Sequence, residues 1–161
     1  MPDPIKAYLK QIEAALAAGN ATEHTHRPAL KALIEALGPG ITAVNEPKSI
    51  ACGAPDFVVQ RADLTGFGNL SGLFNVGYIE AKDVGKSLDE AERAEQLTRY
   101  RRALPNLVLT DYLEFRWYAD GELRTAARLA RAGASGKLTA EKGGTEGVGK
   151  LLGDFLAHQP G

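Results

Sequence analysis

Two short segments of the sequence bring acidic and basic side chains to the ends of predicted strands. Asp56 opens one strand directly after a proline, and Glu80-Ala81-Lys82 ends another. Because side chains alternate along a strand, Glu80 and Lys82 point to the same face, and Asp56 converges on that face if the two strands are neighbours. Two converging carboxylates repel each other unless a cation lies between them. Mg²⁺ takes one or two carboxylates together with waters and phosphate oxygens.

A lysine beside such an ion could orient or deprotonate a water, or stabilise charge on a phosphate. Metal polarisation and water activation are the usual route to phosphodiester hydrolysis. The simpler interpretation of the triplet alone is an ordinary ion pair of Glu80 at a strand end, with Asp56 as a turn residue, because such pairs are common. A further element is needed to favour the hydrolytic interpretation.

A second pair of polar residues stands on a predicted helix. Gln96 and Tyr100 are four residues apart and therefore share one helix face. They border the apolar stripe of that helix, which should pack on the sheet. We therefore expect Gln96 to be buried, and both side chains to line the same cleft as the two carboxylates. Alone, the pair would be interpreted as a surface glutamine and a half-buried core tyrosine.

The spacing of apolar residues predicts the elements that position these side chains. Helices are expected over residues 5–18, 25–37 and 88–103. Strands are expected over residues 41–46, 56–60, 76–82, 107–110, 113–119 and 122–129. Asp120-Gly121 predicts a two-residue hairpin turn, and residues 62–75 a surface loop. The order helix, three strands, helix, strand and hairpin indicates an α/β (α+β) fold, with a mixed central sheet flanked by helices and a C-terminal β-hairpin.

The C-terminal part of the chain is rich in glycine. Six glycines between residues 132 and 149 predict a linker. A short final helix is expected over residues 148–158, where four large apolar residues cluster. No internal repeat is evident.

Composition excludes several classes of protein. The apolar fraction of 44% and charged fraction of 24% are typical of a soluble globular chain. Nineteen Lys and Arg against 20 Asp and Glu argue against a non-specific nucleic-acid binder, which usually has a basic excess, but not against a nucleic-acid enzyme with acidic metal ligands. A single cysteine, Cys52, excludes a disulfide framework. No membrane span or secretory signal is visible, so we expect a cytoplasmic protein without a membrane partner.

Three motifs together resemble the PD-(D/E)xK nuclease superfamily, in its RecB/Mrr-like branch. They are Gly53-Ala54-Pro55-Asp56, Glu80-Ala81-Lys82 and the Gln-x-x-x-Tyr element of residues 96–100. The resemblance implies a restriction-endonuclease-like αβββαβ core and a Mg²⁺ ion, or Mn²⁺ in its place. It implies metal ligands at Asp56, Glu80 and the main-chain carbonyl of Ala81, and catalytic roles for Asp56, Glu80, Lys82, Gln96 and Tyr100. Glu23 either completes the metal site or caps a helix with Asn20.

A closer resemblance covers about residues 20–130. Residues 22–30, 53–57, 78–83 and 107–118 are similar to the N-terminal nuclease domain of type ISP single-chain restriction–modification enzymes. This implies an endonuclease acting on double-stranded DNA in phage defence. Helicase, methyltransferase and target-recognition domains are then expected on the same or a partner chain, so this chain is a fragment or a stand-alone relative.

The same resemblance suggests three parts of the chain. Residues 1–19 would be an N-terminal helix, residues 20–131 the nuclease domain, and residues 132–161 a linker and short helix leading to a following domain. Two other functions remain open: a DNA-repair or recombination nuclease of the same fold, and a non-catalytic DNA-binding module. The joint presence of Asp56, Glu80 and Lys82 argues against the last, because a decayed site would be expected to lack at least one of them.

Overall fold

The computed structural model describes residues 3–19, 21–22, 24–45, 53–62 and 73–159. Glu23, Asn20 and Cys52 therefore lie outside the described residues. The helices are α1 (Pro4–Ala17), α2 (Arg27–Ala36), α3 (Leu88–Arg93), α4 (Glu95–Ala103) and α5 (Gly144–Ala157). The strands are β1 (Ile41–Asn45), β2 (Phe57–Ala62), β3 (Leu73–Ala81), β4 (Asn106–Thr110), β5 (Glu114–Ala119), β6 (Glu122–Arg128), β7 (Ala130–Ala132) and β8 (Leu138–Ala140).

Strands β1 to β6 form one mixed sheet in the order β1-β2-β3-β4-β5-β6. Within this sheet β3 and β4 run parallel, joined by the connection that carries α3 and α4, and the other neighbours are antiparallel. The predicted order of helix, three strands, helix, strand and hairpin is confirmed. Asp120 and Gly121 have φ values of 52° and 84°, the left-handed conformation that a tight hairpin turn requires.

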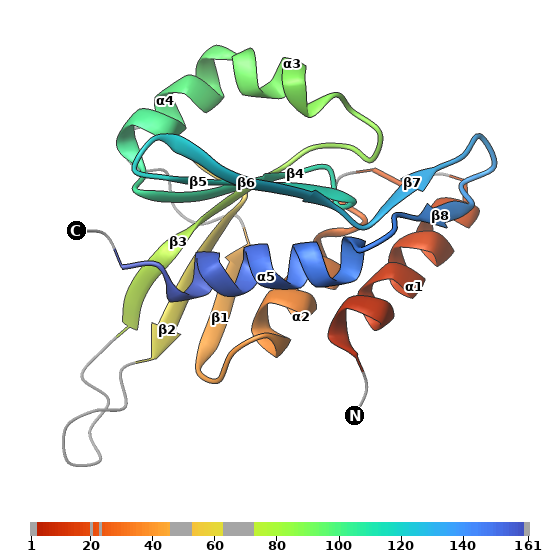
Figure 1. Cartoon of the computed structure of the whole chain (residues 1–161), viewed down its shortest axis with the longest axis horizontal. Coiled ribbons are helices and arrows are strands. Elements are labelled where there is room, and N and C mark those ends of the chain that lie inside the picture. Colours follow the sequence, from red (N-terminus) through yellow and green to blue (C-terminus); the bar gives the residue numbers. More distant parts are fainter. Residues whose placement is uncertain (1–2, 20, 23, 46–52, 63–72, 160–161) are drawn as a thin grey trace.

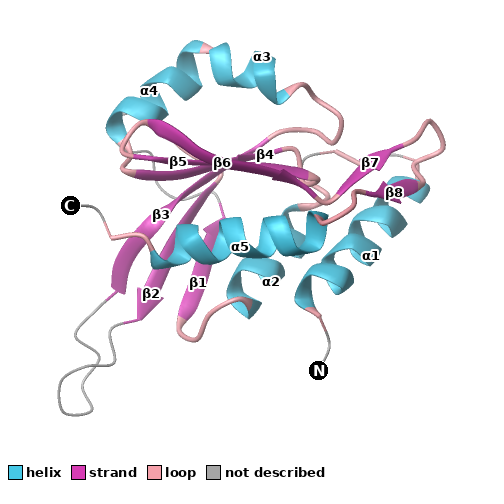
Figure 2. Cartoon of the chain, viewed as in Figure 1, coloured by secondary structure: helices cyan, strands magenta, loops and turns pink. Residues whose placement is uncertain are grey.

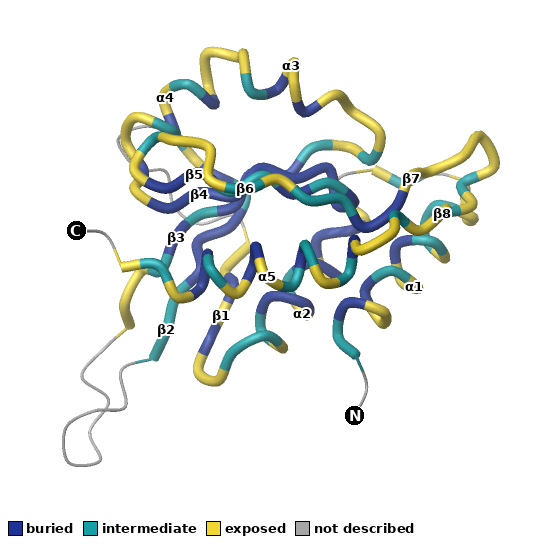
Figure 3. Tube along the Cα trace, viewed as in Figure 1, coloured by how far each residue is buried: buried dark blue, intermediate teal, exposed yellow. Residues whose placement is uncertain are grey.

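Helices cover both faces of the sheet. Figures 1 and 2 show α3 and α4 over one face and α1, α2 and α5 over the other. The larger apolar core lies under α1, α2 and α5, and a smaller core lies under α3 and α4. Strand β4 is buried along its whole length, as Figure 3 shows. This placement explains why residues 107–109 are apolar without alternation.

The helix starts follow the capping signals in the sequence. Oδ1 of Asp3 accepts a hydrogen bond from the Ile5 N–H at 2.9 Å and caps α1. Oγ of Ser87 accepts one from the Glu90 N–H at 3.3 Å and caps α3. Pro28 lies in the first turn of α2, where its missing N–H costs no hydrogen bond.

The predicted helix over residues 88–103 is wrong as a single element. The chain is extended at Ala94 (φ −66°, ψ 148°), and this residue separates α3 from α4. Leu88 of α3 and Leu97 of α4 are both buried. They are nine residues apart, or two and a half helical turns, so a continuous helix would point them in opposite directions. The break lets both helices bury their apolar face against the sheet.

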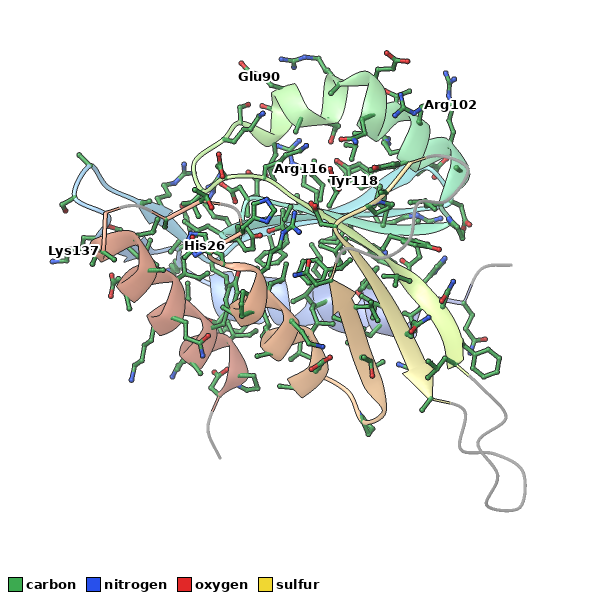
Figure 4. The ribbon with its side chains drawn as sticks, turned by 180° about the vertical axis from the view of Figure 1, so that it is seen from behind. His26, Glu90, Arg102, Arg116, Tyr118 and Lys137 are labelled. Atoms are coloured by element: carbon green, nitrogen blue, oxygen red, sulfur yellow. The ribbon has the colours of Figure 1, made fainter. Side chains whose placement is uncertain are left out.

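Helix α3 is also held by charge. Arg116 of β5 donates hydrogen bonds to Asp89 at 2.8 Å and to Glu92 at 3.1 Å. The hydroxyl of Tyr118 donates to the same Glu92 carboxylate at 2.5 Å. Figure 4 shows Arg116 and Tyr118 between the sheet and these helices. The face of the sheet under α3 and α4 is therefore covered through an ion-pair network as well as through apolar contact.

The prediction of a linker over residues 132–149 is wrong, because this part of the chain forms a hairpin and the start of a helix. β7 and β8 form an antiparallel hairpin, and α5 begins at Gly144. A Cβ on Gly144 would lie 2.4 Å from the main-chain oxygen of Arg128, so this glycine permits a close approach of two backbones. Strand β7 spans residue 131, where the boundary between the nuclease domain and the linker was expected. Helices α1 and α5 both contribute residues to the larger core on the sheet.

Within the part of the chain that the structure describes, none of the helices combines the length and the apolar character that a membrane crossing requires.

Candidate active site

The start of β2 and the end of β3 meet at one edge of the sheet. These strands are antiparallel, and Phe57 is paired with Ile79. Asp56, immediately before Phe57, therefore lies beside Glu80, immediately after Ile79. Lys82 follows β3 directly, and its N–H donates to the carbonyl of Thr110 at the end of β4 at 2.8 Å. Three neighbouring strand ends thus fix the backbone around the predicted residues.

The structure brings Asp56, Glu80 and Lys82 together. Oδ2 of Asp56 accepts a hydrogen bond from the Ala81 N–H at 2.8 Å, and the Asp56 N–H donates to Oε1 of Glu80 at 3.2 Å. Nζ of Lys82 lies 3.4 Å from Oε2 of Glu80. The two carboxylates are therefore linked through the backbone of each other's strand.

Burial shapes the charge of this cluster. The Glu80 side chain is 7% exposed and that of Lys82 23% exposed. Burial, and then the nearby charge of Asp56, raise the pKa of Glu80 to about 7, while Lys82 acts in the opposite direction. A buried carboxylate beside a second, half-buried carboxylate favours binding of either a proton or a cation. The cluster is therefore poised to gain positive charge.

Sequence reasoning missed Arg27. This first residue of α2 is buried, and its Nη2 lies 2.6 Å from Oδ1 of Asp56. Its Nη1 donates to Oδ1 of Asn45, at the end of β1, at 3.1 Å. The contact with Asp56 joins a helix to a strand across 29 positions of the chain. The available signal was only the position of Arg27 within residues 22–30, one of the stretches that carry the family resemblance.

The donor set fits a hard divalent cation. Asp56 and Glu80 supply carboxylate oxygens. The N–H of Ala81 points to Asp56, and in an extended strand the carbonyl of a residue points to the same side as its N–H. Two carboxylates and one carbonyl are ligands that Mg²⁺ accepts, with waters completing the shell. Among the described residues no three His, Cys, Asp or Glu side chains form a metal-binding group, and Glu23 lies outside them.

Tyr100 borders the segment that leads into Asp56. Its ring is fully buried, and a Cβ on Gly53 would lie 3.1 Å from both Cε1 and Oη of this tyrosine. Gly53 has a φ of 130°, which favours glycine. The α4 helix therefore packs through Tyr100 directly on the Gly53-Ala54-Pro55-Asp56 motif.

The expected burial of Gln96 is wrong. Gln96 is exposed, whereas Leu97 and Tyr100 are buried. Because the chain breaks at Ala94, α4 begins at Glu95, and Gln96 lies in the first turn of this helix. In that turn Leu97, and not Gln96, faces the sheet and is buried. Whether Gln96 acts in the site stays a prediction.

The fold has a counterpart among solved structures. No family model matches the sequence, and neither does any curated protein. A chain of the cryo-EM structure of the DrdV–DNA complex is similar over 98% of this chain, with a TM-score of 0.70 and 21% sequence identity. This chain spans 14% of the length of that one. At this identity the likeness concerns the fold, an α+β architecture consistent with a restriction-endonuclease-like fold.

The chain beyond Lys82 is tied to the end of β4. Oδ2 of Asp111 accepts the Gly85 N–H at 3.1 Å, and Oδ1 of the same carboxylate accepts the Glu114 N–H at 2.7 Å. The neighbouring ring of His26 lies 5.1 Å from that of Tyr112, centroid to centroid, and Figure 4 shows His26 near the start of α2. Asp111 and His26 are both buried polar residues that sequence reasoning did not select. They support the loops around the site.

A cavity of about 440 Å³ lies at the same edge of the sheet, beyond Gly85 and Asp111. Arg116 and Arg128 in its wall are paired with Glu114, and Arg131 is paired with Glu141. Neither Asp56 nor Glu80 lines it. These three arginines are thus engaged in pairs with carboxylates of the protein itself, so we assign the cavity no ligand.

Proposed function

We propose that this chain is a Mg²⁺-dependent DNA endonuclease module that hydrolyses phosphodiester bonds. The observation that carries the proposal is the convergence of Asp56, Glu80 and Lys82 at one sheet edge, with Glu80 buried and Asp56 hydrogen-bonded to Ala81. Paired carboxylates beside a lysine are suited to binding a cation and a phosphate together. The similar DrdV chain was solved in a complex with DNA, and this supports DNA as the substrate.

Each residue has a distinct task in the proposed reaction. Asp56, Glu80 and the carbonyl of Ala81 would hold the metal ion, and Mn²⁺ could replace Mg²⁺. A bound ion of this kind polarises the scissile phosphate and lowers the pKa of an attacking water. Lys82 is partly exposed, so its ammonium can reach from Glu80 to a phosphate or water in front of the sheet edge. It would orient the water or stabilise charge that develops on the phosphate.

Glu80 would also exchange a proton for the metal ion. Its raised pKa means that a proton is bound to a sizeable fraction of the molecules near pH 7 when no cation is present. Binding of the ion would release that proton. Tyr100 would act by holding the Gly53–Asp56 segment in place, since its ring packs on Gly53.

We further propose a role in phage defence, as the cleavage part of an ATP-dependent restriction–modification enzyme. The three motifs of the sequence support this role through their resemblance to restriction–modification nucleases. Helicase, methyltransferase and target-recognition functions would then reside on the same or a partner chain.

Metal-dependent nicking of supercoiled plasmid tests the activity. The purified chain should nick plasmid with Mg²⁺ or Mn²⁺ and not with EDTA. Asp56→Asn should lower the rate by at least about 100-fold. Asp154→Asn is the matched control, because Asp154 forms an exposed pair with Lys150 on α5. Equal rates for wild type and Asp56→Asn would contradict the proposal. Binding of DNA without any cleavage would favour the non-catalytic module.

A further inference from the structure

The guanidinium of Arg27 is a cation that the protein itself places beside Asp56. Its guanidinium is 2.6 Å from Oδ1 of Asp56, and the arginine side chain is 5% exposed. A second hydrogen bond, from Nη1 to Asn45 at 3.1 Å, fixes the other arm of the guanidinium. This burial keeps the charge of Arg27 away from solvent and from any phosphate that approaches the sheet edge. The Asp56 carboxylate is a direct partner of this cation.

Each of the two carboxylates already has a basic partner. Asp56 is paired with Arg27, and Glu80 with Lys82. A divalent ion bound to Asp56 would lie close to the guanidinium and be repelled by it. Like charges repel strongly at short range in the low-dielectric surroundings of a buried group, so the guanidinium should lower the affinity of the site for a metal ion.

We propose that Arg27 is a built-in counter-ion of Asp56 that competes with the divalent metal ion and thereby sets the affinity of the site for metal. In the absence of metal, the Arg27 guanidinium is paired with the Asp56 carboxylate. When metal binds, the Arg27–Asp56 pair must loosen or share the carboxylate. This inference rests on the proposed function, because it concerns the same metal site.

The proposal predicts an effect opposite to that of a purely structural role. If Arg27 only anchored α2 or oriented Asp56, its loss would weaken metal binding. If it competes with the ion, its loss must tighten binding while making the metal-free protein less stable. The sign of the change in metal affinity therefore separates the two roles.

Titration of the full chain with Mn²⁺, followed by the electron paramagnetic resonance signal of free Mn²⁺, measures this affinity without DNA. Arg27→Met should bind Mn²⁺ at least about tenfold more tightly than wild type. Arg27→Lys keeps the charge and should bind with wild-type affinity. Arg128→Met is the matched control: it removes the same charge from another arginine–carboxylate pair, that with Glu114, and should leave the affinity unchanged.

A milder variant covers the case in which Arg27→Met does not fold. Asn45 is exposed and anchors only the far arm of the guanidinium, so Asn45→Ala should fold and raise Mn²⁺ affinity severalfold. Circular dichroism confirms the fold of each variant before titration.

The outcomes separate this inference from the proposed function. Unchanged or weaker Mn²⁺ binding by a folded Arg27→Met, beside a wild type that binds Mn²⁺ and loses binding on Asp56→Asn, overturns the role of Arg27 and leaves the metal site standing. If neither wild type nor Arg27→Met binds Mn²⁺, the metal site itself is wrong, and both proposals fall. Tighter binding by Arg27→Met and not by Arg128→Met supports the competition.

Discussion

The carboxylate of Asp56 is hydrogen-bonded to the backbone of Ala81, with 2.8 Å between Oδ2 and the amide nitrogen. This bond joins the residue before β2 to the residue between Glu80 and Lys82. The side chain of one motif is thus positioned by the backbone of the other, and the distance between the two motifs is fixed by sheet pairing and not by a flexible loop.

Lys82 is predicted to act in cleavage and not in metal binding. Its Nζ touches Glu80 at 3.4 Å and remains partly exposed. Lys82→Met should keep the fold and bind Mn²⁺, but lower plasmid nicking by about 100-fold or more, the loss typical for removal of one group that stabilises developing charge. Lys86→Met, at an exposed lysine four residues further on, is the control. Cleavage by Lys82→Met at the wild-type rate would show that the assigned role is wrong.

Glu80 is predicted to make the metal-free protein less stable as the pH rises. Its pKa is raised from 4.5 to about 7 in the folded state, so between these values the folded protein holds a proton that the unfolded chain has released. Stability from this group is therefore greatest below pH 4.5 and is lost as the pH rises towards 7, by about 2–3 kcal/mol.

Urea unfolding of wild type and Glu80→Gln in EDTA, at pH 5 and pH 8, measures this effect. Only the difference between the two proteins is needed, because the other titrating groups, such as His26 with its lowered pKa, contribute to both. Wild type should lose more stability than Glu80→Gln over this range. Equal losses in the two proteins would remove the argument for a raised Glu80 pKa.

Gly53 is predicted to be required by the backbone and by Tyr100. Its φ of 130° is rarely adopted by other residues, and an added Cβ would press on the tyrosine ring at 3.1 Å. Gly53→Ala should lower the free energy of unfolding by about 1–3 kcal/mol. Gly153→Ala is a useful contrast, because a Cβ at this α5 position meets nothing within 4 Å and alanine favours the helix. Chemical denaturation should show opposite signs for the two substitutions.

Local patterns predicted most of the elements and the placement of Asp56, Glu80 and Lys82 at one edge of the sheet. Strand alternation was enough to put Glu80 and Lys82 on one face, and the position of Asp56 at a strand start brought it to the same edge. These inferences needed only neighbouring strands. The hairpin turn at Asp120-Gly121 was likewise set by the residues themselves, since both adopt positive φ.

Features decided by tertiary packing could not be predicted in the same way. Ala94 favours helices, so nothing local marks the break between α3 and α4. The signal for the break was that Leu88 and Leu97 would point in opposite directions on one continuous helix. This signal becomes informative only once both residues are known to be buried against the same face of the sheet. The Arg27–Asp56 pair depends on how α2 crosses the sheet. Gly144 suggested a linker, whereas it serves a close backbone approach at the start of α5.

Gln96 offers the sharpest test of the RecB-like motif. Because its side chain is exposed, a substitution there can change the cleavage rate without changing the stability of the protein. Its side chain is exposed in the first turn of α4, so Gln96→Ala should change the free energy of unfolding by less than about 0.5 kcal/mol. A residue that contacts the phosphate or a metal-bound water only in the presence of DNA would still lower cleavage when it is removed. We therefore expect Gln96→Ala to reduce plasmid nicking by about 10-fold or more, with wild-type Mn²⁺ affinity in the absence of DNA.

Thr98→Ala is the control for Gln96, because Thr98 lies two residues away and its hydroxyl donates to the carbonyl of Ala94, at the start of its own helix. If Gln96→Ala and Thr98→Ala both cut plasmid at the wild-type rate, Gln96 has no part in the site. Tyr100 would then matter for packing on Gly53, and the catalytic argument would rest on Asp56, Glu80 and Lys82.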